Sequence, residues 1–201
     1  MIKAQVNTNG WARRFKFFCA LFAVASVGAA CGVASAAFNG WALGNVAANG
    51  KVILHTENGH DWSVQTTYSS SDPDLGSVDG VPGGVLWTVG AASDGYATIR
   101  RSADQGETWV RQGTSNSLPN VELLKIRAVN ERILWSVGIN GTVVVTTNGG
   151  TDWVNVSLPG VSQLLQGVDA IDAQTAWVGG ESDTNGFAVL YHTTNGGATW
   201  T

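Results

Sequence analysis

The chain has 201 residues, including 26 glycines and nine tryptophans, and its formal net charge is −4 at pH 7. Glycine makes up about 13% of the residues, against about 7% in an average protein. Only 13% of the residues are charged. This composition argues against helices and disorder, and it favours an all-β fold of short strands joined by tight turns.

The first 36 residues differ from the rest. Four basic residues and no acid precede an apolar run over residues 17–33, and Ala34-Ser35-Ala36 matches the pattern of a signal-peptidase site. We predict a signal peptide over residues 1–36, export to a periplasmic, lumenal or extracellular compartment, and a mature domain over residues 37–201. Two alternatives stay open. One is lipid attachment at Cys31, although Gly28 stands where such sites favour leucine. The other is an uncleaved anchor, although the run is shorter than the ~20 residues of a spanning helix.

Cleavage after Ala36 would remove both cysteines, Cys19 and Cys31, and with them any disulfide or thiolate metal site. Eleven basic residues less the four of the leader leave seven against 15 acidic residues, a formal net charge of −8 for the mature domain. So acidic a domain is a poor partner for nucleic acid. We expect neither a cofactor nor a metal.

A phrase that ends on tryptophan recurs at residues 55–62, 102–109, 146–153 and 193–200, at intervals of 47, 44 and 47 residues. A second tryptophan precedes each phrase: Trp41, Trp87, Trp135 and Trp177. A period in the forties is typical of blade repeats, in which each unit is a small sheet. Four strands are expected per unit, and in the third interval they fall at residues 163–170, 176–179, 189–193 and 199–200. Residues 121–129 hold helix-forming residues, but their place in the repeat predicts a strand.

Each phrase has the chemistry of a hairpin turn. A glycine three residues before the tryptophan supplies a positive φ, and the residue five before it accepts hydrogen bonds from turn amides. A hydroxyl closes the network in three copies, and His55 breaks the pattern in the first. The residues assigned to these turns are Glu57, Gly59, Trp62, Ser102, Asp104, Gly106, Trp109, Thr146, Asn148, Gly150, Trp153, Thr193, Asn195, Gly197 and Trp200.

Residues 102–109 match in full the Asp-box, or bacterial neuraminidase repeat, pattern Ser-x-Asp-x-Gly-x-Thr-Trp. With the Trp-x-Val-Gly phrase and the Thr-Thr-Asn-Gly-Gly run, residues 38–201 resemble most closely the photosystem II assembly and stability factor family. The resemblance implies an exported or lumenal seven-bladed β-propeller with four-stranded blades. It also implies an arginine-rich surface that grips a protein client in a membrane complex.

The 165 residues from Ala37 to Thr201 correspond to three and a half to four blades at this period, at or below the lower end of the 4–8 blades that close a propeller ring. We therefore expect a fragment of a seven-bladed propeller, incomplete at its C-terminus. Two alternatives are that residues 33–38 supply the first blade's inner strand and that two chains complete one ring.

Asp-box proteins include sialidases, but one turn-forming role explains all four copies, and active sites are not repeated in every blade. No catalytic residue is predicted, because the tyrosine, glutamate and arginine set of a sialidase is not recognisable. Two places hold candidate metal ligands: Asp72, Asp74 and Asp79 in an expected loop over residues 68–84, and the pair His55 and His60. Both are better explained by solvated polar residues.

Six of the seven mature basic residues lie within 33 positions: Arg100, Arg101, Arg111, Lys125, Arg127 and Arg132. They form either a basic binding patch or ion pairs with Asp104, Glu107, Glu122 and Glu131. We predict a non-enzymatic, exported propeller that binds a protein client. The alternatives are a fragment of an Asp-box glycoside hydrolase, sialidase-like or xyloglucanase-like, and a sortilin-like extracellular binding module.

Overall fold

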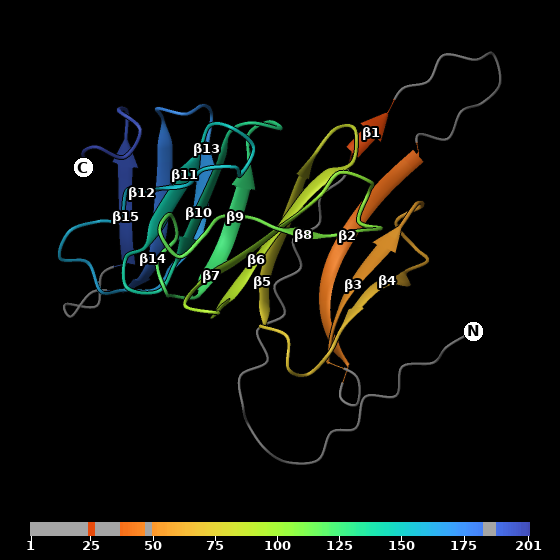
Figure 1. Cartoon of the computed structure of the whole chain (residues 1–201). Coiled ribbons are helices and arrows are strands. Elements are labelled where there is room, and N and C mark those ends of the chain that lie inside the picture. The colour runs from red at the N-terminus through yellow and green to blue at the C-terminus, as the bar shows by residue number, and fades with distance from the viewer. Residues whose placement is uncertain (1–23, 27–36, 47–49, 183–187) are drawn as a thin grey trace.

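The computed structural model describes residues 24–26, 37–46, 50–182 and 188–201 (Figure 1). All the regular elements in these ranges are β-strands, and they form four antiparallel sheets that follow one another along the chain. No helix in the described part is long and apolar enough to cross a membrane.

Each sheet is one blade, with its strands in sequence order. The first contains β1 (Val24–Ser26), β2 (Ala37–Val46), β3 (Gly50–Thr56) and β4 (Ser63–Tyr68). The second contains β5 (Leu75–Val81), β6 (Val85–Ser93), β7 (Tyr96–Ser102) and β8 (Val110–Arg111). The third contains β9 (Leu123–Ala128), β10 (Leu134–Gly138), β11 (Val143–Thr146) and β12 (Val154–Asn155). The fourth contains β13 (Leu165–Ala170), β14 (Ala176–Ser182) and β15 (Ala188–Thr193).

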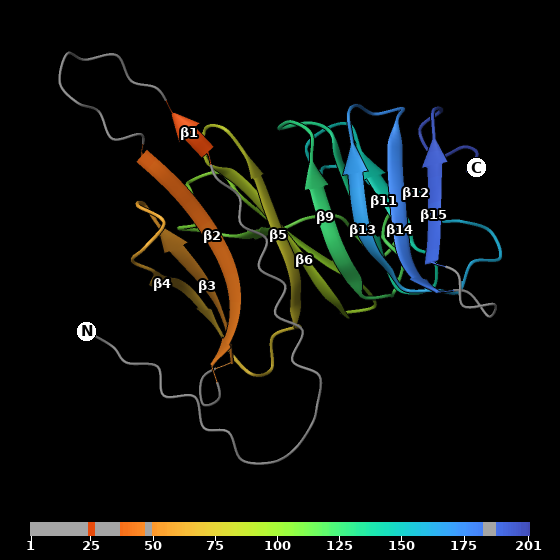
Figure 2. The same cartoon turned by 180° about the vertical axis from the view of Figure 1, so that it is seen from behind.

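The first strands of successive blades lie side by side. Strand β9 contacts both β5 and β13, and Figure 2 shows these three strands in order along one side of the stack. They occupy the inner position of a propeller, and the later strands of each blade extend outward from them. Thr201 exchanges two backbone hydrogen bonds with His192, at 2.8 and 2.9 Å, in the place of the fourth blade's outer strand. The described chain is therefore a partial β-propeller, as predicted.

Two details differ from the expected layout. Residues 68–84, expected to form a loop, contain the inner strand β5. Its glycines and its aspartate hide the strand signal, because glycine and aspartate have low strand propensity. The strand in the first blade's inner position is β1, which pairs with β2 from Val24↔Asn39 to Ser26↔Ala37. It lies inside the segment predicted to be a leader, whose residues 1–23 and 27–36 are outside the described residues.

Apolar cores fill the spaces between blades, and each contains the tryptophan of a second strand: Trp41, Trp87 and Trp135. Each of the three is buried against the turn-bearing edge of the next blade. The Trp41 indole donates to the Gln105 carbonyl at 3.1 Å, and Trp135 meets Trp200 edge to face at 6.3 Å between ring centroids. A buried tryptophan contributes a gross gain of about 4–6 kcal/mol as an upper bound.

Gly106 sits at such a contact. Its φ is +90°, and a Cβ there would lie 2.5 Å from Gln65 Oε1 and 3.3 Å from the Trp41 indole nitrogen. Gly95 has a similar φ of +86° but nothing within 4 Å of such a Cβ. Comparing the two glycines separates the backbone cost of adding a side chain from the cost of crowding the first blade.

We expect Gly106→Ala to lower the free energy of unfolding by about 2–4 kcal/mol, against about 1 kcal/mol for Gly95→Ala. Both variants carry the left-handed backbone cost, and only Gly106→Ala intrudes on the first blade. Urea unfolding of the two variants measures the difference. Equal losses would contradict the close packing of this turn against the first blade.

Candidate functional site

The turn at residues 102–109 is closed by its own side chains. The Ser102 hydroxyl donates to Asp104 Oδ1 and accepts from the Gly106 amide, both at 2.7 Å. Asp104 in turn accepts from the Thr108 amide at 2.9 Å and from the Thr108 hydroxyl at 2.6 Å. The carboxylate therefore acts as an acceptor that holds the turn together.

The third and fourth turns repeat this network with a threonine hydroxyl and an asparagine amide: Thr146 with Asn148, and Thr193 with Asn195. The glycine of all four turns has a positive φ: 75° at Gly59, 90° at Gly106, 93° at Gly150 and 84° at Gly197. Of the tryptophans that end the turns, Trp153 is buried and Trp62, Trp109 and Trp200 are half-buried. The repeated polar residues thus serve the backbone.

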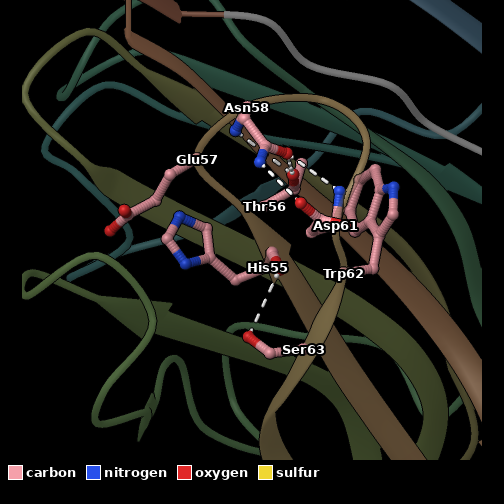
Figure 3. Close-up of a pocket in the computed structure, with 7 residues that line it drawn as sticks. All are labelled: His55, Thr56, Glu57, Asn58, Asp61, Trp62 and Ser63. Atoms are coloured by element: carbon pink, nitrogen blue, oxygen red, sulfur yellow. Dashed lines mark hydrogen bonds between the residues drawn. The ribbon is translucent and has the colours of Figure 1, made fainter. Parts of the chain in front are cut away.

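The first turn is one residue shorter than the others. Its network is made by Thr56, whose hydroxyl accepts from the Gly59 amide at 3.0 Å, and by Asn58, whose Oδ1 accepts from the Asp61 amide at 2.8 Å. The expected acceptor, Glu57, is exposed and points away from this network, and a hollow of about 290 Å³ lies beside the turn (Figure 3). His55 stacks on Trp41 at 4.9 Å between ring centroids.

The hydrogen bonds of the second turn act on its acid. Donation from Thr108, and then from Ser102, lowers the pKa of Asp104 from 3.8 to about 2. The ionised form is thus favoured in the folded state. The stability that it contributes is present above pH 3.8 and is lost as the pH falls toward 2.

Asp104→Asn removes this titration, and asparagine occupies the same place in the other three turns. We expect the difference in unfolding free energy between the natural protein and Asp104→Asn to be constant above pH 4 and to shift against the natural protein between pH 4 and about 2. Urea unfolding at several pH values measures it. Parallel pH profiles in this range would contradict the assigned role of the carboxylate.

Charged side chains occupy the same place on three neighbouring inner strands. Asp79 on β5, Arg127 on β9 and Asp169 on β13 each pair in register with the tryptophan of the second strand of their blade. Arg127 bridges the two acids, with Nε 3.0 Å from Asp169 Oδ1 and Nη1 4.0 Å from Asp79 Oδ2. We call Asp79, Arg127 and Asp169 the axial row.

The two acids of the axial row have different surroundings. Asp79 is buried and accepts from the amides of Ala128, at 2.8 Å, and Gly80, at 2.9 Å. Burial raises its pKa, against those amides and the positive charges of Arg127 and Lys125. The side chain of Asp169 is 72% exposed. The row therefore fastens the third blade to the second and presents a carboxylate and a guanidinium to solvent.

Because the pKa of Asp79 is raised in the folded state, its contribution to stability is full below pH 3.8 and is lost as the pH rises through the raised pKa. Asp79→Asn keeps an acceptor oxygen for the Ala128 amide and does not titrate. We expect this variant to gain stability relative to the natural protein as the pH rises from 4 to 7. Guanidinium unfolding across this range tests it. A constant difference would contradict the rise in the pKa of Asp79 on folding.

The six clustered basic residues are separated by the structure. Arg100 stacks over Tyr68 and pairs with Asp72 at 3.3 Å, and Arg111 stacks over Tyr96 and pairs with Asp94 at 2.7 Å. These ion pairs use other acids than the expected Asp104, Glu107 and Glu131.

The remaining basic residues lie in three places. The guanidinium of Arg101 lies 5.6 Å from the centre of the Trp87 ring. Lys125 and Arg127 share the inner strand β9, and Arg132 is exposed in the hairpin between β9 and β10. The inner strand thus brings two of the six together beside the axial acids.

The three aspartates that are candidate metal ligands do not form one site in the described residues. Asp72 accepts from Ser69 and pairs with Arg100, Asp74 pairs with Lys51 at 3.3 Å, and Asp79 belongs to the axial row. The described part of the chain contains no group of three or more histidine, cysteine, aspartate and glutamate side chains placed to bind a metal.

No family model matches the chain, and no curated protein matches it. Solved structures do. YCF48 from Cyanidioschyzon merolae aligns with a TM-score of 0.56 and 20% identity, over 81% of this chain and 51% of that one. The GH74 enzyme of Niastella koreensis aligns with a TM-score of 0.50 and 19% identity, over 82% and 23%. YCF48 bound to a D1 peptide aligns with a TM-score of 0.47 and 15% identity, over 81% and 76%.

The alignments with YCF48 from Cyanidioschyzon merolae and with the GH74 enzyme show the fold. The described residues form a partial β-propeller similar to the propeller of YCF48, and the chain spans about half the length of the protein from Cyanidioschyzon merolae. Propellers carry unrelated functions, so function has to be argued from the residues of the site.

Proposed function

We propose that this protein is an exported, non-enzymatic β-propeller that binds a protein client and assists its assembly into a membrane complex. The observation that carries the proposal is the charged surface of the inner strands. Lys125 and the axial row hold charges of both signs on neighbouring strands of a rigid sheet stack. Such a surface can orient a charged polypeptide segment without rearranging on binding.

The contacts of the axial row favour a role in binding a partner over a role in catalysis. Arg127 engages both acids, and Asp79 also accepts from two backbone amides. Groups held in this way are fixed in place, as recognition requires. Lys125 extends the positive charge along β9 and acts electrostatically on Asp79. A client segment that carries an acid is the partner this strand would attract.

The sequence resemblance supports a client of the same kind. The tryptophan phrases resemble those of the photosystem II assembly and stability factor family, whose members use an arginine-rich surface to grip a client. The leader predicted over residues 1–36 would deliver the protein to a compartment where such a client is exposed. We place the equivalent basic surface at Lys125 and Arg127.

Charge reversal at Lys125 tests the proposal. We expect Lys125→Glu to reduce capture of the client from detergent-solubilised membranes by about five- to tenfold and to weaken the salt dependence of capture. Arg132→Glu is the matched control, because it makes the same charge change at an exposed position beyond the end of β9. Thermal melts establish that both variants fold. Equal capture by the two variants would overturn the assignment of the surface.

A glycoside hydrolase is the second candidate, and the unlike surroundings of the two axial acids favour it. A buried carboxyl with a raised pKa beside an exposed one is an arrangement that glycosidases use for acid and base. Incubating the protein with xyloglucan and with a sialoside, and repeating the assay with Asp79→Asn, distinguishes the candidates. Hydrolysis that this variant abolishes would replace the binding proposal.

A further inference from the structure

The charges on the inner strands of the second, third and fourth blades balance. Strand β9 carries two cations, Lys125 and Arg127, and its neighbours β5 and β13 carry the acids Asp79 and Asp169 (Figure 2). Strand β5 contacts β2 and β9, and β9 contacts β5 and β13. The surroundings of Asp79 and Arg127 are therefore set by neighbouring blades on either side.

Asp79 is the acid of this group that has no cation in close contact. Its side chain is 9% exposed, and Arg127 Nη1 lies 4.0 Å from its Oδ2. A charge-assisted hydrogen bond spans about 2.7–2.9 Å, and the guanidinium makes its closer contact, at 3.0 Å, with Asp169. Among the described residues Lys125 forms no ion pair. A carboxylate buried in this way favours its protonated form.

The other strands packed against β5 add no charge near Asp79. Strands β2 (Ala37–Val46) and β6 (Val85–Ser93) contain no acidic, basic or histidine residue. The charged groups that act on Asp79 are thus Lys125 and Arg127 of β9, with Asp169 of β13 acting through Arg127. Burial outweighs the two cations and raises the pKa of Asp79, which agrees with the geometry.

Protonation of Asp79 can leave the contact between the blades intact. Its Oδ2 accepts from the Ala128 amide at 2.8 Å, and its Oδ1 accepts from the Gly80 amide at 2.9 Å. A neutral carboxyl carries its proton on one oxygen and keeps its remaining capacity to accept. The change is therefore one of charge: the four side chains carry no net charge when Asp79 is ionised and one positive charge when it is protonated.

We propose that Asp79 makes client capture depend on protons: ionised, it cancels positive charge on β9, and protonated, it leaves a net positive charge that holds an acidic client segment. The inference rests on the function proposed above and adds how the same surface is regulated. Binding and protonation favour each other, because an acidic group at β9 makes a charged Asp79 more costly. Capture therefore strengthens as the pH falls.

Capture of the client from detergent-solubilised membranes at pH 7.5 and at pH 5 tests this link. We expect the natural chain to capture about three- to fivefold more at pH 5. Asp79→Asn carries no charge at either pH, so it captures at the higher level at both. Glu131→Gln is the matched control, because it removes a negative charge at an exposed position beyond the end of β9; it keeps the pH dependence of the natural chain. Thermal melts at each pH establish folding.

A second measurement needs no variant. A carbon NMR titration of the Asp79 carboxyl in the natural chain gives its pKa, which we expect above the ordinary value of 3.8. A pKa at or below that value overturns the proposal. Equal capture by the natural chain at the two pH values overturns it, and so does an unchanged pH dependence in Asp79→Asn.

The variant Lys125→Glu separates failure of this proposal from failure of the proposed function. If Lys125→Glu lowers capture and the natural chain shows no pH dependence, the link to Asp79 is wrong and the binding surface stands. If Lys125→Glu leaves capture unchanged, both are overturned.

Discussion

The structure depends on the burial of one tryptophan per blade against the next blade. A four-stranded blade has two faces and cannot bury either by itself. Trp41, Trp87 and Trp135 are each buried in one of the three cores that join neighbouring blades. The second turn has to be rigid, because its Gln105 carbonyl accepts the hydrogen bond of the Trp41 indole. The hydroxyl and carboxylate networks give the turns that rigidity.

The separate roles of the buried tryptophans and the polar turns explain why the repeat can be recognised in the sequence. Burial fixes the tryptophans and a positive φ fixes the glycines, so both recur at a constant period. The inner strands carry weaker signals, since a strand such as β5 is defined by what packs beside it. Its Ser77-Val78-Asp79-Gly80 run has the composition of a loop, so the sequence predicts a loop over residues 68–84 where the structure has a strand.

The first turn shows a second limit of prediction from the sequence, which concerns the assignment of residues to positions in the turn. Counting back from Trp62 places Glu57 in the acceptor position, whereas the hydrogen bonds are made by Thr56 and Asn58. The deleted residue lies between the acceptor and the tryptophan. The hydroxyl-x-acceptor spacing of Ser102 and Asp104 is kept by Thr56 and Asn58, so alignment from the start of the turn would have found the register. The axial row had no such signal, because Asp79, Arg127 and Asp169 are brought together by the side-by-side packing of three inner strands.

The axial row and the tryptophans are linked through the strand register. Asp79, Arg127 and Asp169 each lie opposite a second-strand tryptophan, so the packing that fixes the tryptophans also fixes the charges on the inner surface. A shift of one blade against the next would separate Arg127 from both acids and would expose the Asp79 carboxyl that the Ala128 amide now holds. The same apolar contact that builds the stack therefore also sets the spacing of charges that a partner would meet.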